Sequence, residues 1–306
     1  MTIALIIPDR KLDDLHQRLS LALPGTDIEI WPAITEPDKV EFAVVWKQPK
    51  DSLANLRSLK AIQCFGAGVD AILADTSLPA VPIARIVDNS LSQTMVRYLD
   101  GVVSHYRLRL DQFKQQQQQT LWQPKGPRRL SNICVLGLGE LGAAAAQHFS
   151  MLGYRVSGWA RTAKQLNNID SYYGAAGLSA AAANADIVIC LLPLTPATEN
   201  LLTDAFFNQL KGGAIFINVA RGALVDDRAL LQALDSGKLQ AACLDVFRQE
   251  PLAETHPFWQ HPAILITPHV SAVTSVTAVI EQIANNYQRS QRGEPMLNLV
   301  DVERGY

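Results

Sequence analysis

Three residues that could bind and protonate a carbonyl acid follow predicted strands in the second half of the chain. Arg221 comes after the apolar run AIFINVA, Glu250 lies in the loop after LDVF, and His269 follows ILITP. In an open parallel sheet, ligands gather outside the carboxyl ends of the strands. An arginine holds a carboxylate with two parallel hydrogen bonds, and a histidine can give a proton near neutral pH. Each residue alone is more often structural, but the three together, downstream of a turn that could bind a dinucleotide, are much more specific for an active site.

A glycine-rich turn predicts a site for a dinucleotide. In ICVLGLGELGAAAA, the residues Gly137, Gly139 and Gly142 fit G-x-G-x-x-G between an apolar strand and an alanine-rich helix, which is the context the motif requires. Gly137 permits the tight turn, Gly139 lets the backbone approach a pyrophosphate, and Gly142 lets the helix pack close to the sheet. The N–H groups of Glu140 and Leu141 then point at phosphate. The alternative is an ordinary glycine-rich turn of an α/β protein.

The end of the next predicted strand favours NADPH over NADH. A strand that binds NAD usually carries Asp or Glu about 20 residues after the turn, but this strand ends in GWARTAK. Arg161 and Lys164 offer positive charge, and Thr162 offers a hydroxyl. The guanidinium fork suits a 2′-phosphate. The alternative for Arg161 is a solvated surface side chain.

Composition argues against several classes of protein. The 306 residues carry 27 basic and 29 acidic side chains, a net charge of −2, which gives no overall attraction to nucleic acid or to an anionic membrane. No apolar run approaches the ~18 residues of a membrane helix, and the N-terminus lacks the pattern of a signal peptide. The four cysteines have no metal-ligand spacing, so we expect reduced thiols in a cytoplasmic protein and no metal site.

Apolar runs alternate with segments of helical periodicity, which predicts parallel sheets covered by helices. In the first part we expect strands at 3–7, 28–31, 42–46 and 61–65, and helices at 12–23 and 52–56. In the second part we expect strands at 133–136, 155–159, 187–192, 214–219, 241–246 and 264–267, and a last helix at 276–291. Asp226 precedes the helical run RALLQAL and is predicted as its N-cap. The pattern predicts two doubly wound α/β domains, 1–97 with 273–306, and 98–272.

A long polar and amphipathic stretch covers residues 93–122 and includes five consecutive glutamines, 115–119. Such a run can mark disorder. Helical spacing nevertheless continues through Val102, Tyr106, Leu110 and Phe113. We therefore expect a helix whose glutamines form a solvated face. The segment 123–129, with two prolines and a glycine, ends it.

Several segments resemble signature segments of the D-2-hydroxyacid dehydrogenase family. They are NVARGALVDDRALLQAL, LDVFRQEPL, TPHVSAVT, LLPLTPATENLL and GAGVD. The strand GWART and the terminal RGY are most similar to the glyoxylate/hydroxypyruvate reductase A branch of that family. The resemblance covers nearly the whole chain and is firmest over residues 133–275. It implies a flavodoxin-like substrate domain and a Rossmann NAD(P)-binding domain.

The resemblance implies an oxidoreductase that transfers hydride from NADPH, with NADH possible, to a small 2-oxo acid. Glyoxylate would give glycolate, and hydroxypyruvate would give D-glycerate. Arg221 would bind the substrate carboxylate and polarise the carbonyl. His269 would donate a proton to the carbonyl oxygen. Glu250 would hydrogen-bond His269 and hold it protonated.

Further cofactor contacts are implied around the nicotinamide and the adenosine. Leu192, Pro193 and Thr198 match the family's loop beneath the adenosine and the nicotinamide ribose. Ala220 and Asp245 match positions near the nicotinamide, where Asp245 would accept a hydrogen bond from the carboxamide. The alternative for Asp245 is a cap at the end of a strand.

The first domain would supply the remaining substrate contacts. Ala67 and Gly68 of GAGVD would offer backbone N–H groups to the substrate carboxylate, since glycine allows a close approach. Trp46 resembles a substrate-loop residue of the reductase A branch, and its alternative is a core or loop aromatic. The resemblance also implies a homodimer with residues 93–122 as the arm. The alternative for the arm is an intradomain helix and loop, and the sequence does not place Trp122.

Two other functions fit the same fold. One is a phosphoglycerate-type dehydrogenase, but such enzymes typically prefer NAD and often carry a regulatory domain, for which no room follows His269. The other is a non-catalytic dinucleotide sensor that binds partner proteins. A pure sensor has no chemical need for Arg221, Glu250 and His269 together. Turnover with glyoxylate separates the two classes.

Overall fold

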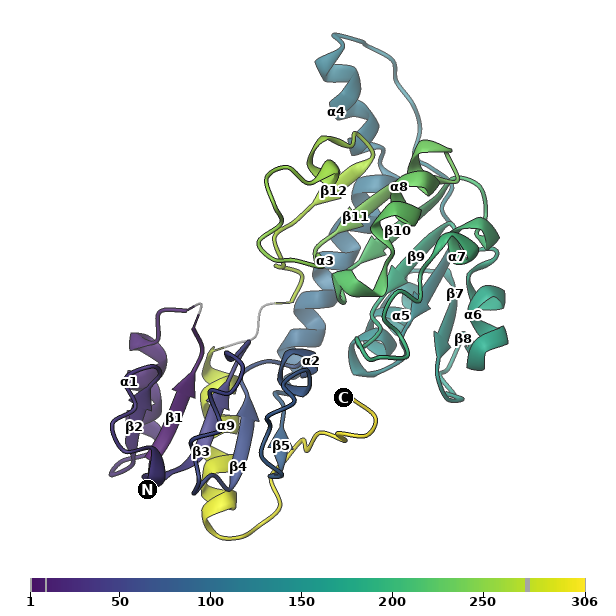
Figure 1. Ribbon diagram of the computed structural model, residues 1–306. Helices are drawn as coiled ribbons and strands as arrows, with labels where there is room; N and C mark the ends of the chain where they lie inside the picture. Colours follow the sequence, from purple (N-terminus) through teal and green to yellow (C-terminus); the bar gives the residue numbers. More distant parts are fainter. Residues whose placement is uncertain (1, 9, 273–275, 306) are drawn as a thin grey trace. The chain divides into compact units, whose positions relative to one another are not determined.

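The computed structural model describes residues 2–8, 10–272 and 276–305, and the chain forms two compact units (Figure 1). Unit 1 comprises Met1–Ser90 and Thr274–Tyr306, and unit 2 comprises Leu91–Val273. All pairings between named strands are parallel, and helices pack on both sheets. The prediction of two doubly wound α/β domains is confirmed. The division falls near the start of helix α3 (Asn89–Arg107), whereas the expected boundary at residue 97 lies inside that helix.

Unit 1 contains a five-stranded sheet in the order β2-β1-β3-β4-β5. The strands are β1 (Thr2–Ile6), β2 (Asp27–Ile30), β3 (Val40–Val45), β4 (Ala61–Cys64) and β5 (Ile83–Ala84). The helices are α1 (Asp13–Ala22), the 3₁₀ helix η1 (Pro37–Lys39), α2 (Asp70–Leu73) and α9 (Val276–Gln291). This strand order is the flavodoxin-like form of the doubly wound sheet.

Successive residues of β1 face opposite layers of unit 1, as the period of a strand requires. Ile3 and Leu5 pack with α1 and α9. Ala4 and Ile6 pack with α2 and with the turns at 53–59. A buried amide pair also ties α9 to the sheet, because Asn286 Nδ2 donates to Gln63 Oε1 at 2.7 Å. The C-terminal helix is therefore part of the core of unit 1.

Unit 2 contains a seven-stranded sheet in the order β12-β11-β10-β9-β6-β7-β8. The strands are β6 (Asn132–Leu136), β7 (Arg155–Ala160), β8 (Ile169–Tyr173), β9 (Ile187–Cys190), β10 (Ala214–Asn218), β11 (Leu239–Leu244) and β12 (Ile264–Ile266). The chain winds outward in both directions from β6, so the order reverses between β6 and β9. Ligands bind at such a switch point in doubly wound sheets. The glycine-rich turn follows β6 there.

Helices cover both faces of the unit 2 sheet. Ile133 and Val135 of β6 pack with α3 and α5 (Glu140–Met151). Cys134 and Leu136 pack on the other face with α6, α7 and α8. The remaining helices are α4 (Leu110–Gln118), α6 (Gly174–Ala182), α7 (Asp204–Gln209), α8 (Asp227–Asp235), η2 (Gly222–Leu224) and η3 (Pro257–Gln260). Asp226 caps α8 as predicted, since its carboxylate accepts from two backbone N–H groups of the first turn.

Some predicted elements differ from the structure. The helix expected at 52–56 is wrong: the segment forms consecutive turns, in which Leu56 N–H donates to Leu53 O at 3.1 Å. Leu53 and Leu56 are both buried, and a spacing of three suits a series of turns as well as a helix. The sequence analysis also missed α2, β5 and β8. β5 has only two residues, and β8 reads IDSYY, which lacks a continuous apolar run.

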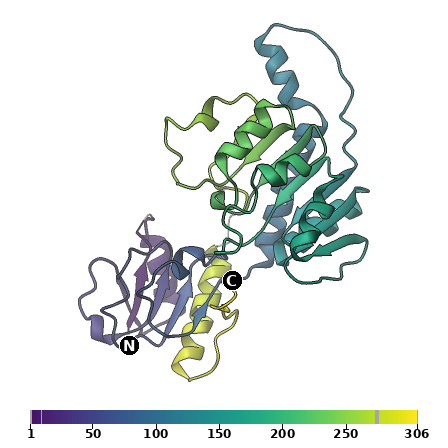
Figure 2. The ribbon, with the colours of Figure 1, turned by 45° about the vertical axis from the view of Figure 1, so that its right-hand side comes forward.

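The stretch at 93–122 forms two helices, α3 and α4, rather than one. Arg109 lies between them with φ of 63°, in the left-handed region that an α-helix cannot contain. Four of the five glutamines are exposed, which agrees with a solvated helix face, while Gln116 is buried. After α4, residues 121–131 run back to β6 without helix or strand (Figure 2).

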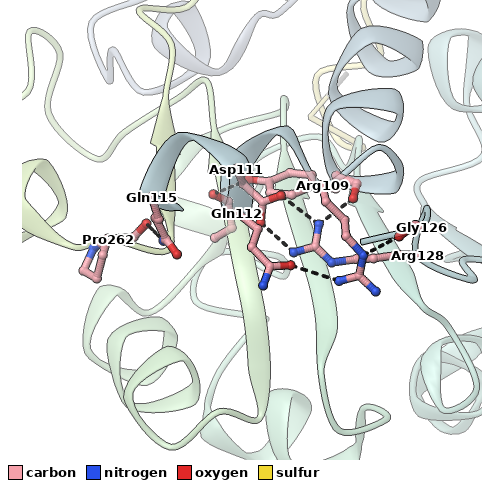
Figure 3. A network of polar contacts seen from close by, with 9 residues as sticks. Arg109, Asp111, Gln112, Gln115, Gly126, Arg128 and Pro262 are labelled. Atoms are coloured by element: carbon pink, nitrogen blue, oxygen red, sulfur yellow. Dashed lines mark hydrogen bonds and ion pairs between the residues drawn. The ribbon is translucent and has the colours of Figure 1, made fainter. Parts of the chain in front are cut away.

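Hydrogen bonds of two arginines hold this loop against the region of α3 and α4 (Figure 3). Arg128 is buried, and its guanidinium holds both carboxylate oxygens of Asp111 at 2.8 Å. It also donates to the carbonyl of Tyr106. Arg109 Nε donates to Gly126 O at 2.7 Å. These bonds give α4 and its loop one defined arrangement within unit 2.

Burial raises the pKa of three of the four cysteine thiols. Cys64, Cys134, Cys190 and Cys243 are all free and buried. Burial raises the pKa of Cys134 and of Cys190 to about 12, and that of Cys243 to about 11. Within the described ranges, we find no helix with the length and apolar character needed to cross a membrane.

Candidate active site

Glu250 and His269 form a hydrogen-bonded pair at the carboxyl end of the unit 2 sheet. His269 Nδ1 lies 2.8 Å from Glu250 Oε2. The other carboxylate oxygen accepts from the backbone N–H of Phe247 at 3.1 Å. An ionised carboxylate only accepts hydrogen bonds, so Nδ1 carries a hydrogen. Nε2 is then the ring nitrogen left to exchange a proton with a substrate.

Asp245 holds the loop that carries His269. Its side chain is fully buried, and its two oxygens accept from the backbone N–H groups of Val270 and Ser271, each at 2.9 Å. Its carbonyl accepts from His269 N–H at 2.8 Å. This bonding corresponds to the strand-end cap that we weighed as an alternative. The expected bond from Asp245 to a carboxamide stays a prediction.

Arg221 lies at the same edge of the sheet, after β10. Asn218, at the end of that strand, is buried and donates from Nδ2 to the carbonyl of Arg221 at 2.9 Å. The next residue, Gly222, packs on the loop of Glu250: a Cβ on it would lie 2.0 Å from the carbonyl carbon of Phe247. Since Phe247 N–H also binds Glu250, the turn after Arg221 contacts the segment that orients the Glu250–His269 pair.

The three side chains together suit the reduction of a 2-oxo acid. Arg221 offers a forked cation for a carboxylate. The Glu250–His269 pair offers a proton donor whose orientation is fixed by a carboxylate. A cation and an acid at one edge both stabilise negative charge that develops on a carbonyl oxygen.

The geometry of the glycine-rich turn fits a dinucleotide pyrophosphate. Gly137 has φ of +101°, and a Cβ on it would lie 2.6 Å from Leu191 O. A Cβ on Gly142 would lie 1.7 Å from Gly137 O, so this position accepts no side chain. Gly139 differs, because a Cβ there would meet no protein atom within 4 Å. Glu140 and Leu141 begin α5, where free backbone N–H groups attract phosphate.

Because Gly139 has open space where Gly142 is closely packed, alanine at the two positions should affect different properties. Gly139→Ala should fold normally and raise the Kd for NADPH at least about tenfold, because the added methyl group occupies the approach of the pyrophosphate. Gly142→Ala should lower the free energy of unfolding by about 1–3 kcal/mol, because it overpacks the turn. Fluorescence titration with NADPH and thermal unfolding check both results.

Gly212→Ala is the matched control, since a Cβ there also meets no protein atom within 4 Å and the residue lies outside the turn. It should change neither quantity. Wild-type NADPH affinity in Gly139→Ala would show that no pyrophosphate approaches this glycine.

The strand that follows α5 ends in basic residues, as its sequence indicated. Arg161, Thr162 and Lys164 all lie in the exposed segment directly after β7. Gly158 of this strand packs against Leu138 of the glycine-rich turn, where a Cβ would meet the leucine at 2.6 Å. The end of β7 and the turn are thus adjacent, and no Asp or Glu stands between residues 155 and 164.

The other predicted cofactor residues occupy loops at the same edge. Leu192 is buried and Pro193 is exposed just after β9, and Ala220 follows β10. Thr198 shapes its own loop: its hydroxyl donates to Pro193 O at 2.7 Å and accepts from Thr195 N–H at 2.8 Å. Among the residues that the structure describes, no three His, Cys, Asp or Glu side chains gather as a metal site.

Within unit 1, the predicted substrate residues lie close to one another. Trp46 follows β3, and Ala67 and Gly68 follow the adjacent strand β4. The indole lies on the backbone of Gly66, where a Cβ would be 2.1 Å from a ring atom. The Cys64 thiol donates to Gly68 O at 3.2 Å, and this hydrogen bond helps to hold the loop at 66–68. Trp46 therefore covers the loop whose N–H groups were predicted to meet a carboxylate.

Asn218 was missed by the sequence analysis although it orients the Arg221 turn. A signal for it existed, because Asn218 is the one polar residue in the run AIFINVA and stands where the strand ends. A polar side chain at the end of a buried strand needs a partner. Here the partners are the carbonyl of Arg221 and the N–H of Ala220.

A glycine-rich turn at the switch point of a parallel sheet, with Arg, Glu and His at the same edge, defines a dinucleotide-dependent dehydrogenase. Residues 101–271 match the family model described as D-isomer specific 2-hydroxyacid dehydrogenase, NAD binding domain. The chain belongs to the D-isomer specific 2-hydroxyacid dehydrogenase family and is an oxidoreductase. The resemblance stated from the sequence is confirmed.

Individual relatives agree with this assignment. The chain is 40% identical over 297 residues to glyoxylate/hydroxypyruvate reductase A of Yersinia enterocolitica, which covers 94% of each chain. A D-isomer specific 2-hydroxyacid dehydrogenase of Xanthobacter autotrophicus, solved with NADPH and MES, is similar with a TM-score of 0.93 and 38% identity, over 100% and 99% of the two chains. An NADPH-dependent glyoxylate/hydroxypyruvate reductase of Sinorhizobium meliloti, solved with NADP and sulfate, has a TM-score of 0.92 and 31% identity over the same shares.

Proposed function

We propose that this chain is a cytoplasmic, NADPH-dependent reductase of small 2-oxo acids, which converts glyoxylate to glycolate and hydroxypyruvate to D-glycerate. The observation that carries the proposal is the Glu250–His269 pair at 2.8 Å, on the sheet edge that also bears Arg221. The names of the relatives at 31–40% identity support the same substrates. The four free, buried thiols support a reducing compartment.

In this reaction, NADPH supplies a hydride when it is bound. The residues of the chain bind the acid, polarise its carbonyl group and supply the proton. Arg221 binds the carboxylate of the substrate and draws electron density from its carbonyl. His269 gives the proton on Nε2 to the carbonyl oxygen, and Glu250 stabilises the protonated ring that this step requires. Ala67 and Gly68 offer N–H groups to the carboxylate, and Trp46 limits the size of the acid beside that loop.

Arg161 sets the preference for NADPH in this proposal. Its guanidinium matches a 2′-phosphate, and no carboxylate at the end of β7 is available to bind a 2′-hydroxyl. Arg161→Ser should raise the KM for NADPH about tenfold or more and leave the KM for NADH within about twofold. Initial rates with both cofactors check this. Arg155→Ser, an exposed arginine at the start of the same strand, is the control.

A second copy of the chain covers α4 and its loop in this proposal. Large apolar side chains are exposed on α4 and on the segments next to it: Leu108 is 50% exposed, Leu110 48%, Leu121 41% and Trp122 95%. Large apolar side chains that gather on one surface mark interaction sites. The segment 93–122, which the family resemblance predicts as the dimer arm, contains these residues. Sedimentation velocity should give the mass of a dimer, and a monomer at micromolar concentration would refute this part.

The function is tested by identifying the products. Purified protein with NADPH and hydroxypyruvate should form glycerate that chiral chromatography assigns to the D-isomer. Glyoxylate should give glycolate, while bulkier 2-oxo acids should react more slowly because Trp46 covers the loop at 66–68. Formation of L-glycerate, or no product from either acid, would contradict the proposal.

A further inference from the structure

A chain of hydrogen-bonded polar groups, partly buried at Tyr98 and Thr267 and fully buried at Asp245, leads from helix α3 to the loop of His269. Tyr98 lies in α3, and its hydroxyl oxygen is 2.6 Å from Thr267 Oγ1, across 169 positions of the sequence. Thr267 Oγ1 is in turn 2.5 Å from Asp245 Oδ1. The Asp245 carboxylate accepts from the backbone N–H groups of Val270 and Ser271, while the backbone carbonyl of Asp245 accepts from His269 N–H. Tyr98 is therefore connected to the proton-donor loop through two side chains.

The direction of each hydrogen bond follows from counting hydrogens. The Asp245 carboxylate can only accept, so the single hydroxyl hydrogen of Thr267 points to it. Thr267 then accepts from Tyr98, which must donate its own hydrogen. Cys243 Sγ lies 3.4 Å from the same tyrosine oxygen, and its thiol is the remaining donor. Burial raises the pKa of Tyr98 above its usual range, which keeps the phenol a donor at every pH of interest.

The loop needs this support because its backbone is strained at His269, the proposed proton donor. His269 has φ of 54°, a left-handed conformation that residues with a Cβ rarely adopt. Such a conformation persists only where the surroundings determine it. Here the N–H of His269 donates to the main-chain carbonyl of Asp245, and the N–H groups of the two residues after it donate to the carboxylate of Asp245. Linked hydrogen bonds also strengthen one another in a buried site.

We propose that Tyr98 is a positioning residue of the reduction, whose hydroxyl acts through Thr267 and Asp245 to hold the loop of His269 in place. It touches neither substrate nor cofactor in this account. The inference rests on the proposed function for its kinetic consequence, but the positioning itself concerns only the loop.

Helix α3 provides a matched control. Tyr106 is the other tyrosine of α3; it is buried, and its hydroxyl donates to Ala242 O of β11 at 3.0 Å. Both tyrosines thus join α3 to β11, Tyr98 through Cys243 and Tyr106 through Ala242. Only Tyr98 also contacts Thr267. Phenylalanine at either position removes one hydrogen-bonded hydroxyl and keeps the ring. Any general cost of losing such a bond should be shared by the two variants.

The first measurement is kinetic. Tyr98→Phe should lower kcat with glyoxylate about three- to tenfold, the equivalent of one buried hydrogen bond, and leave the KM for NADPH unchanged. Tyr106→Phe should change neither. Thr267→Val should lower kcat further, and Tyr98→Phe combined with Thr267→Val should be no worse than Thr267→Val alone, because the two residues act in series. Additive losses would overturn the proposed chain.

The second measurement does not depend on activity. Hydrogen–deuterium exchange of the peptide covering 267–271 should be faster in Tyr98→Phe than in the wild type and unchanged in Tyr106→Phe. Equal exchange in the two tyrosine variants would overturn the proposal, even if kcat differs. If the wild-type protein reduces no 2-oxo acid, the proposed function fails, and the exchange of this loop still decides whether Tyr98 holds it.

Discussion

Replacing His269 with glutamine should lower kcat for glyoxylate about 10²- to 10⁴-fold, the range that a positioned general acid contributes. Glutamine can still donate an amide hydrogen bond to Glu250 but cannot deliver a proton at neutral pH. The KM for NADPH should stay within about twofold, because the proposed function assigns cofactor binding to the glycine-rich turn and Arg161. Stopped-flow measurement of the absorbance at 340 nm separates the reduction step from cofactor binding.

His261→Gln is the control for this experiment. His261 lies before β12 in the same unit, and it pairs with Asp235 at 3.4 Å rather than with the Glu250 loop. Its replacement should leave kcat within about twofold. A His269→Gln variant with at least a third of wild-type kcat would show that another group, or water, provides the proton.

Replacing Arg221 with lysine should lower kcat/KM for glyoxylate about 10²- to 10³-fold, although the charge is retained. Lysine offers a point charge, whereas the substrate carboxylate and the developing negative charge both require the planar fork. Loss of one partner of a buried charged hydrogen bond costs about 2–5 kcal/mol, which agrees with this range. Most of the loss should appear in the KM for the acid, because the carboxylate is bound before reduction. Steady-state kinetics over a wide range of glyoxylate concentrations checks it.

Arg228→Lys is the corresponding control. Arg228 is exposed in the first turn of α8, close in sequence to Arg221 but outside the predicted site. It should leave both constants unchanged. Similar losses in the two variants would mean that Arg221 acts through the stability of unit 2 and not through the carboxylate.

The sequence predicted the strands and the site residues at their ends because both depend on local patterns. Buried parallel strands appear as short apolar runs, and polar residues that end such runs must share one edge of the sheet. Arg221, Glu250 and His269 could be placed in this way. The N-cap of α8 was likewise predictable, because Asp226 binds N–H groups only two and three residues away.

Features that depend on distant contacts were not predictable from the sequence. The bond between Tyr98 and Thr267 spans 169 positions of the sequence. Helical periodicity predicts that this segment is a helix, but it does not show which distant residue the tyrosine contacts. The sequence offered two roles for Asp245, a contact to the nicotinamide by resemblance and a cap at the strand end, and it did not show that its oxygens bind backbone N–H groups of the His269 loop. The segment at 52–56 shows the same limit, since apolar residues three apart are buried equally well by turns or by a helix.

The central claim is that this chain uses NADPH to reduce a small 2-oxo acid. The most direct test is the initial loss of absorbance at 340 nm with glyoxylate, measured in parallel with NADPH and with NADH. We predict rapid loss with NADPH and a kcat/KM at least about tenfold lower with NADH, because Arg161 stands where an acid would bind the 2′-hydroxyl. Equal efficiency with both cofactors would contradict the role of Arg161. No loss with either cofactor, from glyoxylate or from hydroxypyruvate, would contradict the account as a whole.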